Sequence, residues 1–388
     1  MIGRGRLGAM LFLTVMACAA LAAALWSGAG EGRVGWDETL VVPAPLVGVL
    51  GPVADGSSLG GLLGEIDAAV AAFERRRGAR GAGAVVVLVV VDSPGGMLAA
   101  TPGLSDVMAG PLRERGEVVS HVAEALSAAA LAAMTAERLT FEPDGVLGAA
   151  VTVEVDPLTG AGRELSPREE RVALRVGEIV AERGGHSRQV MLALQAPTGL
   201  SIGLAGNGRD GGGEMILAND ASLERVVARP GELLTLNAET ARELGLSVGS
   251  VGIDALLVGE DGARAAAQRR ELARALGVEA VRVDLRAWRA GIAEAERRER
   301  ALEAASEAVR RLAAAMRSVR GGEMEAAGPA RRALADLRAI AAENGRLAAY
   351  FDLSDERLAG YEAEIERLAG EGDGAGAGAS GAGEEERR

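Results

Sequence analysis

The 388-residue chain contains no lysine, so its 42 basic residues are all arginines. The guanidinium group of arginine stays protonated in folded proteins and cannot accept a proton as a general base. A catalytic site in this chain therefore has no lysine base, and a second copy of the chain cannot supply one.

Cysteine, histidine and aromatic residues are also scarce. The single cysteine, Cys18, excludes an intrachain disulfide bond, and one cysteine with two histidines leaves no His/Cys cluster for zinc. We therefore expect no metal site and no cofactor. Aromatic residues make up only 2% of the chain, so its core must consist of aliphatic side chains.

The charge of the chain argues against nucleic acid as a partner. The formal net charge is -13, and no basic stripe with interleaved aromatic residues is present. Apolar residues make up 48% of the chain, and a chain of this length is long enough for one large domain or two with a substantial core.

Residues 1–36 have the pattern of an export signal followed by a linker. Arg4 and Arg6 precede a long apolar stretch at residues 7–26. This length favours an uncleaved membrane anchor, and the positive-inside rule places the main body outside the cytoplasm, in a periplasmic or other extracytoplasmic position. The alternative is a cleaved signal and an exported soluble product. Cys18 ends a short segment that resembles a lipoprotein processing box, but the residues after it stay apolar.

Strand and helix patterns alternate from residue 37 to residue 260. The apolar run at residues 84–91 is typical of a strand that a parallel sheet buries on both faces. This alternation predicts a layered α/β fold. Strands are expected at residues 39–53, 84–91, 117–122, 139–141 and 251–258, and helices at 59–77, 101–115, 127–138, 167–183, 188–195 and between the cap Asn237 and Gly245. The glycine-rich segment 206–213 lacks the features of a phosphate loop, so we interpret it as a surface turn.

The composition changes to Ala, Arg and Glu after residue 260. Apolar residues spaced alternately by three and four predict a helical extension at residues 261–369, which forms a helical hairpin or a coiled-coil arm that packs on itself or on a partner. A disordered Gly, Ala and acidic tail is expected at residues 370–388. The spaced residues are Leu302, Ala305, Val309, Leu312, Met316 and Val319, repeated by Leu358, Tyr361, Ile365 and Leu368.

Two short motifs have the residue types that acyl-transfer chemistry needs. Gly95 and Gly96 follow a predicted buried strand, where backbone N–H groups without side chains can hold an oxyanion. Ser127 stands at the start of an alanine-rich predicted helix, where unpaired N–H groups and the helix dipole favour a developing negative charge. A turn and a plain helix cap are the alternative interpretations of these two motifs.

Four segments together resemble the Clp-protease/crotonase superfamily in their order and spacing. They are VDSPGG at 91–96, ALSAAA at 125–130, GVLGAA at 145–150 and LTLNAETARELGL at 234–246. The likeness is strongest to membrane-associated serine peptidases of the signal peptide peptidase A and NfeD types. The resemblance implies repeated ββα units in a serine peptidase domain at residues 37–260, Ser127 as the nucleophile, Gly95 and Gly96 as the oxyanion-binding residues, and an extended peptide as substrate.

The expected base is the main departure from this superfamily. Its membrane-associated members use a Ser–Lys dyad, but the corresponding helix here, residues 188–194, has only apolar residues near the lysine position. The soluble Clp subunit uses a Ser-His-Asp triad. His121 precedes Ser127 and does not match that order, whereas His186 follows it and is the predicted base. The carboxylates nearby in sequence are interpreted as solvated or turn residues; they are Asp92, Glu124, Glu142 and Asp144.

Two hypotheses about function follow. In the first, the chain is a membrane-anchored serine peptidase acting on peptides or membrane-associated proteins, with Ser127 activated by His186 or by an unlike partner. In the second, it is an inactive peptide-binding or scaffold protein that forms a homo-oligomer through its core and helical extension. Acyl-CoA chemistry of the crotonase type is a more remote third alternative.

Overall fold

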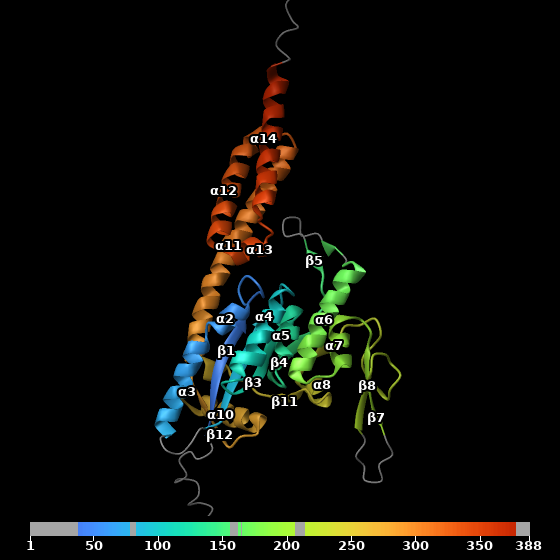
Figure 1. Ribbon diagram of the computed structural model, residues 1–388, viewed down its shortest axis with the longest axis vertical. Coiled ribbons are helices and arrows are strands. Elements are labelled where there is room, and N and C mark those ends of the chain that lie inside the picture. The colour runs from blue at the N-terminus through green and yellow to red at the C-terminus, as the bar shows by residue number, and fades with distance from the viewer. Residues whose placement is uncertain (1–37, 78–82, 156–161, 164, 206–213, 378–388) are drawn as a thin grey trace, which may run out of the picture.

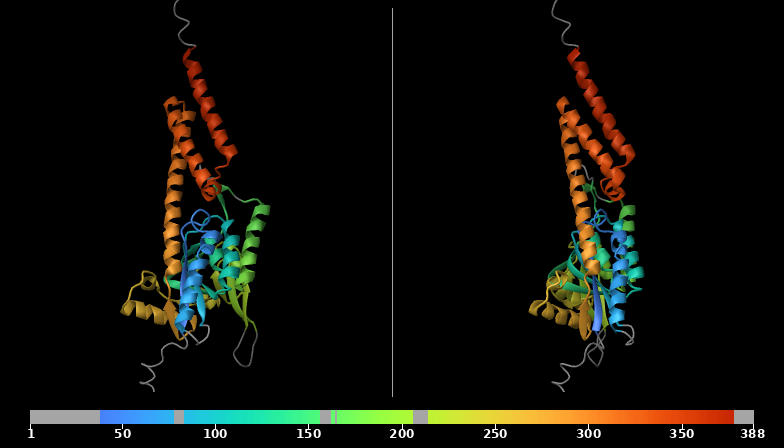
Figure 2. Two further views of the ribbon diagram at one scale, coloured as in Figure 1. Left: turned by 60° about the vertical axis from the view of Figure 1, so that its left-hand side comes forward. Right: turned by 90° about the vertical axis from the view of Figure 1, so that its left-hand side faces the viewer.

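The computed structural model describes residues 38–77, 83–155, 162–163, 165–205 and 214–377. The chain forms a sheet domain, residues 38–283, and a helical arm, residues 286–377, which rises from one side of it (Figures 1 and 2). Among the described residues, no helix is long and apolar enough to cross a membrane. The predicted anchor at residues 1–36 and the glycine-rich turn at 206–213 lie outside the described residues.

The described part of the sheet domain has a central seven-stranded sheet. The strands follow the order β10-β4-β3-β2-β1-β12, and β11 also pairs with β4; β10 runs antiparallel to its neighbour and the other pairs are parallel. The strands are β1 (Glu38–Val47), β2 (Val85–Ser93), β3 (Glu117–Leu126), β4 (Arg138–Gly148), β10 (Thr235–Leu236), β11 (Ser247–Ser250) and β12 (Ala280–Val283).

Helices cover both faces of this sheet, so the valine run of β2 is buried on both sides. Val87, Val89 and Val91 belong to one core cluster, whereas Val86 and Val90 belong to the cluster on the opposite face. Side chains of a strand alternate between the two faces, which explains why a continuous apolar run is required here. The first face is packed by α3 (Leu63–Arg77), α4 (Ala100–Val107), α5 (Ala128–Ala133) and α6 (Pro167–Gly184), and the second by α9 (Asp254–Leu257) and α10 (Ala263–Leu276).

Several predicted elements agree with the structure, and their caps are the predicted residues. Ser166 caps α6 with a reciprocal capping box, and Gly185 ends that helix in the left-handed conformation. Asn237 caps α8 (Ala238–Glu243), and α7 (Arg188–Gln195) has the predicted bounds. The prediction of an α/β fold with a C-terminal helical region is therefore confirmed.

At the end of the sheet domain, the structure differs from the prediction in two details. Residues 251–258 were expected as a strand, but residues 254–257 form the short helix α9, and the strand is β11 just before it. A short apolar run suits a buried helix as well as a strand, and here its apolar side chains pack on the sheet face. In addition, α10 and β12 belong to the sheet domain, because β12 pairs with β1, so the boundary at residue 260 is too early.

The helical arm consists of helices that pack on one another. The predicted seam residues are buried or partly buried in a core made only of arm residues. Helix α14 continues to Ala377, so the prediction of disorder from residue 370 is wrong as far as residue 377, and the rest of the tail lies outside the described residues. The arm comprises α11 (Arg286–Arg320), α12 (Ala327–Glu343), α13 (Gly345–Tyr350) and α14 (Asp355–Ala377).

The first turns of α11 anchor the arm to the sheet domain. Gly291 packs so closely on β1 that an added Cβ would lie 2.4 Å from Pro45 Cγ. Ala287 is buried in the core of the sheet domain. The same helix therefore belongs to both parts of the molecule, as Figure 2 shows.

Two small sheets complete the described chain. One is the hairpin of β5 (Glu154–Val155) and β6 (Gly162–Arg163), which lies on the side of the domain that faces the arm (Figure 1). The other has the order β8-β7-β9 and comprises β7 (Leu200–Ala205), β8 (Glu214–Ala218) and β9 (Arg225–Ala228).

Candidate active site

Ser127 occupies a strained turn between β3 and α5. Its φ is 54° and its ψ is -127°, a combination that side-chain-bearing residues rarely adopt. Such strain costs on the order of 1–3 kcal/mol and is concentrated at functional sites. Ser127 is partly buried at this turn. Within the described residues the Ser127 hydroxyl makes no capping hydrogen bond to α5.

The end of the neighbouring strand holds this turn in place. The Ser127 N–H donates to the carbonyl oxygen of Gly148 at 3.0 Å, and Leu126 pairs with Gly148 in the sheet. Ala149, directly after Gly148, also has a positive φ, of 50°. Two strained residues therefore lie at the adjacent ends of β3 and β4, where the chain turns sharply beside Ser127.

Gly95 lies against Ser127, and the two N–H groups of the glycine pair differ in their partners. A Cβ added to Gly95 would lie 2.6 Å from Ser127 Cβ, so only glycine fits there. The Gly95 N–H is within hydrogen-bond distance of the buried Ser93 hydroxyl, at 3.2 Å, and that hydroxyl donates to Gly48 O at 2.6 Å. The Gly96 N–H has no acceptor among the described residues. Of the two, only the Gly96 N–H is left without a partner in the described chain.

Ala128 provides a second free donor that sequence analysis does not single out. It is the first residue of α5, and its N–H has no acceptor within the described part of the chain. The first N–H groups of a helix have no partner inside the helix. Its position directly after a serine that begins a helix is the signal from which it could have been found.

His186 is not brought to Ser127. It follows the C-terminal cap of α6, and its Nε2 donates to the carbonyl oxygen of Ala136 at 2.7 Å. Ala136 lies beyond the C-terminal end of α5, whereas Ser127 precedes the N-terminal end, so the helix separates the two side chains by roughly 9 Å of axial rise. Burial lowers the pKa of His186, and the carbonyl of Ala136 and the charge of Glu137 oppose this shift. The geometry does not support His186 as the base.

His121 is fully buried on the opposite face of the sheet. Its Nδ1 lies 2.8 Å from Thr140 Oγ1, and its Nε2 lies 3.1 Å from Glu142 Oε1. Glu142 also accepts the N–H of Ile253 at 3.1 Å. The neighbouring residue Ser120 bonds to α5, so alternation places His121 on the other face. This histidine holds β3, β4 and the segment before α9 together.

The carboxylates near the glycine pair also face away from the serine turn. Asp92 is paired with Glu124 across β2 and β3, next to the pair Ser93 and Ala125. Ala125 is buried on the face that α5 covers, so the adjacent Glu124 points to the other face. No His, Asp, Glu or Lys side chain is hydrogen-bonded to the Ser127 hydroxyl among the residues that the structure describes, and no group of metal-binding side chains is found there.

An apolar hollow lies beside the segment that follows β4. Its cavity volume is about 330 Å³. It begins at Val151, next to Ala150, whose N–H donates to Leu194 O at 2.9 Å. The hollow therefore lies a few residues along the chain from Gly148, the partner of Ser127. It is lined by Val151, Thr152, Val153, Leu165, Glu170, Ala173, Leu174, Gln195, Ala196 and Pro197.

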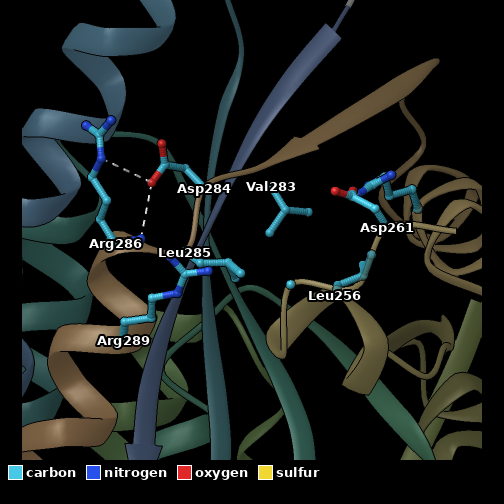
Figure 3. A pocket seen from close by; sticks show the side chains of 9 residues that line it. Leu256, Asp261, Val283, Asp284, Leu285, Arg286 and Arg289 are labelled. Atoms are coloured by element: carbon cyan, nitrogen blue, oxygen red, sulfur yellow. Dashed lines mark hydrogen bonds and ion pairs between the residues drawn. The ribbon is translucent and has the colours of Figure 1, made fainter.

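A second hollow is charged and is formed by a different part of the fold (Figure 3). It lies between α9, α10 and the start of α11 and has a volume of about 320 Å³. Asp284 accepts the N–H of Arg286 at 3.2 Å, and Asp261 lies 3.5 Å from Arg269. No residue from the serine turn or the glycine pair lines it, so it is separate from the candidate active site.

Neither a family model nor a curated protein sequence matches the chain. Solved structures that are similar to it include a mutant of the 1510-N membrane-bound stomatin-specific protease. That match has 15% identity and a TM-score of 0.36, and covers 58% of this chain and 86% of the other. Another mutant of that protease, in complex with a substrate peptide, matches with 16% identity, a TM-score of 0.36, and coverage of 58% and 81%.

A ClpP1 structure is also among the similar structures. The ClpP1 protein from Listeria monocytogenes matches with 12% identity and a TM-score of 0.29, covering 54% of this chain and 90% of the other. Because the identities and TM-scores are low, no residue role and no activity is transferred from these proteins to this chain.

Proposed function

We propose that the protein is a membrane-anchored serine peptidase-like protein that acts on peptides or on membrane-associated proteins. The proposal rests above all on the strained turn that presents the Ser127 hydroxyl beside a glycine pair. A strained serine with no capping role and two free N–H groups nearby are the parts that acyl transfer needs.

The chemistry assigns one role to each of these groups. Ser127 Oγ attacks the carbonyl carbon of the scissile peptide bond, and the carbonyl oxygen becomes an oxyanion. The N–H groups of Gly96 and Ala128 then donate hydrogen bonds to that oxygen. The C–N bond breaks to give an acyl-enzyme and a free amine, and water later hydrolyses the ester.

The proton of the Ser127 hydroxyl needs an acceptor. Neither histidine lies beside Ser127, and the arginines of the chain cannot act as bases. We assign the base to an unlike partner protein that binds at the serine turn. The same basic group of the partner protein returns the proton to the leaving amine, so the proton taken from Ser127 is accounted for.

The apolar hollow next to Ala150 supports a peptide as the ligand. An extended peptide that lies across Ser127 and follows residues 148–153 directs an apolar side chain into this space. The volume of about 330 Å³ suits a branched aliphatic or an aromatic side chain. Glu170 at the lining disfavours an acidic side chain there because like charges repel.

The location in the membrane rests on residues 1–36 alone, with their two arginines and long apolar stretch. We propose that this segment stays attached and holds the sheet domain outside the cytoplasm. Partitioning of the full chain into detergent, compared with a chain that lacks residues 1–26, tests this. Recovery of the full chain in the aqueous phase would contradict it.

A non-catalytic peptide-binding protein is the second candidate. It is favoured by the lack of a titratable side chain at the Ser127 hydroxyl within the described residues. An unactivated serine is a poor nucleophile at neutral pH. In this case the apolar hollow binds a peptide that is never cleaved, and the chain works as an oligomeric scaffold.

Labelling with a fluorophosphonate distinguishes the two candidates. The probe bonds covalently to an activated serine hydroxyl and releases fluoride. The parent, Ser127→Ala and His186→Ala proteins are purified from membranes with their partners retained. We expect labelling of the parent, none of Ser127→Ala, and unchanged labelling of His186→Ala. An unlabelled parent that still binds an apolar peptide supports the scaffold.

A further inference from the structure

The helical arm contacts the sheet domain through a carboxylate, Asp55, that lies just beyond β1. Arg346 of α13 reaches Asp55 Oδ2 with its Nε at 2.9 Å, and Arg298 of α11 reaches Asp55 Oδ1 at 3.4 Å. Arg298 also donates to the carbonyl oxygen of Val53 at 3.1 Å. Two arginines, separated in sequence from this loop by more than two hundred residues, therefore hold one short segment of the sheet domain.

Asp55 is fixed from its other side by its own chain. It is the N-cap of α2 (Gly56–Gly60), and its carboxylate accepts the N–H of Ser58 at 2.8 Å and the hydroxyl of Ser57 at 2.9 Å. Burial raises the pKa of Asp55, but these two hydrogen bonds and the charges of Arg346 and Arg298 outweigh it and lower the pKa overall. The carboxylate is thus held in its charged form between the arm and α2.

The segment before Asp55 supports the glycine pair. The N–H of Leu50 donates to the carbonyl oxygen of Gly95 at 2.8 Å, and Leu50 O accepts the N–H of Met97 at 2.9 Å. A Cβ added to Gly96 would lie 2.3 Å from Leu50 O, so the two backbones are in direct contact. Gly51 donates to Ala54 O at 2.8 Å, which closes a tight loop that ends next to Asp55.

We propose that Asp55 is a positioning residue for the Gly95–Gly96 loop, and that the helical arm sets the place of this loop through Arg346 and Arg298. The path runs from the two arginines to Asp55, through residues 49–54, to the backbone of Gly96. Its catalytic consequence rests on the proposed function, because Gly96 is there the oxyanion donor. Its mechanical part does not depend on any activity.

Hydrogen exchange of backbone amides, followed by mass spectrometry on the full chain, tests the mechanical part. In Arg346→Ala and Asp55→Asn, we expect the amides in peptides that cover residues 48–55 and 94–98 to exchange about tenfold faster, since hydrogen bonds to charged groups are lost. Asp55→Asn keeps an oxygen that caps α2, so its effect reports the lost charge. Arg346→Lys keeps the charge and should restore most of the protection.

Arg338→Ala is the matched control, because it removes an arginine of the same arm that pairs with Glu362 and does not touch the loop. It should leave both segments as in the parent. Amides of β3 report whether each variant is folded. Faster exchange at residues 48–55 with parental exchange at 94–98 would overturn the proposal, as would no change at either segment in a folded variant.

The rate of fluorophosphonate labelling in the same variants tests the catalytic consequence. Slower labelling of Arg346→Ala, but not of Arg338→Ala, supports a role of the arm in positioning Gly96. An unlabelled parent would contradict the peptidase function, and the exchange experiment would still decide whether the arm positions the loop. A failure of the peptidase function can therefore be distinguished from a failure of the proposal that the arm positions the loop.

Discussion

The sheet domain and the helical arm are stabilised in different ways. The sheet domain has aliphatic cores on both faces of the sheet, and its strained residues Ser127 and Ala149 lie at adjacent strand ends. The arm has a narrow apolar core whose edges carry ion pairs between helices: Arg311–Asp336, Arg320–Glu364, Arg331–Glu366 and Arg338–Glu362. The sheet domain therefore depends mainly on the burial of aliphatic side chains, whereas the arm combines a narrow core with ion pairs at the edges of its helices.

The largest expected effect on stability comes from removing a buried side chain from the core of the sheet domain or from the core of the arm. Phe141→Ala removes a fully buried ring from the sheet domain and should cost about 3–5 kcal/mol of its free energy of unfolding. Leu312→Ala, in the arm core, should instead cost about 2–5 kcal/mol of the arm's stability. Calorimetry together with hydrogen exchange by segment measures both. Equal loss of protection in both parts from either variant would show that they unfold as one unit.

A smaller effect on the free energy of unfolding is expected from substitution of the strained Ser127. Ser127→Gly removes the side chain that makes a φ of 54° unfavourable, so it should raise the free energy of unfolding of the sheet domain by about 1 kcal/mol. Ser127→Ala keeps a Cβ and should change stability little, so it is the matched control. Urea denaturation of the two variants gives the comparison, and a destabilised Ser127→Gly would show that the turn is not strained.

The stability of the sheet domain should decrease as the pH falls below about 6.5, because His186 is partly buried there. Burial lowers the pKa of His186 in the folded state below 6.5. As the pH falls through the unfolded-state pKa, the unfolded chain gains a proton that the folded chain disfavours, so stability decreases. His186→Gln should remove this part of the slope in urea denaturation at several pH values. An identical slope in parent and variant would contradict the assignment.

The smallest effect is expected from a single ion pair of the arm. Arg338 and Glu362 are largely exposed, and exposed pairs contribute little because water and salt screen them. Arg338→Ala should therefore leave the melting temperature nearly unchanged, and raising the salt concentration should reduce even that difference. A large loss of arm stability would show that the ion pairs act as a network rather than singly.

Much of the fold follows from local patterns in the sequence. The valine run of β2, the capping box at Ser166 and the cap at Asn237 each specify an element through contacts within a few residues. The sequence does not distinguish a strand from a buried helix at residues 251–258, because a short apolar run fits both. The sequence pattern does not predict β12, because the pairing of this strand with β1 joins residues more than two hundred positions apart.

Some parts of the candidate site can be predicted from the sequence, and others depend on the tertiary structure. Ser127 and the glycine pair are recognisable in the sequence because their neighbours form a motif, and the structure places Gly95 against Ser127. Which N–H of the pair is free depends on the hydroxyl of Ser93, and the place of His186 depends on how α6 packs beside α5. Neither the free N–H group nor the position of His186 can be predicted from the spacing of residues in the sequence.

The sequence by itself determined that lysine cannot be the base, that the core is aliphatic, and where most helices begin and end. These properties depend on composition and on contacts between near neighbours. Only the tertiary structure decided that both histidines lie away from the Ser127 hydroxyl and that two arginines of the arm hold Asp55 beside the glycine loop. Those relations join residues far apart in the chain, and they arise only when the strands and helices of the sheet domain pack together and the arm packs on that domain.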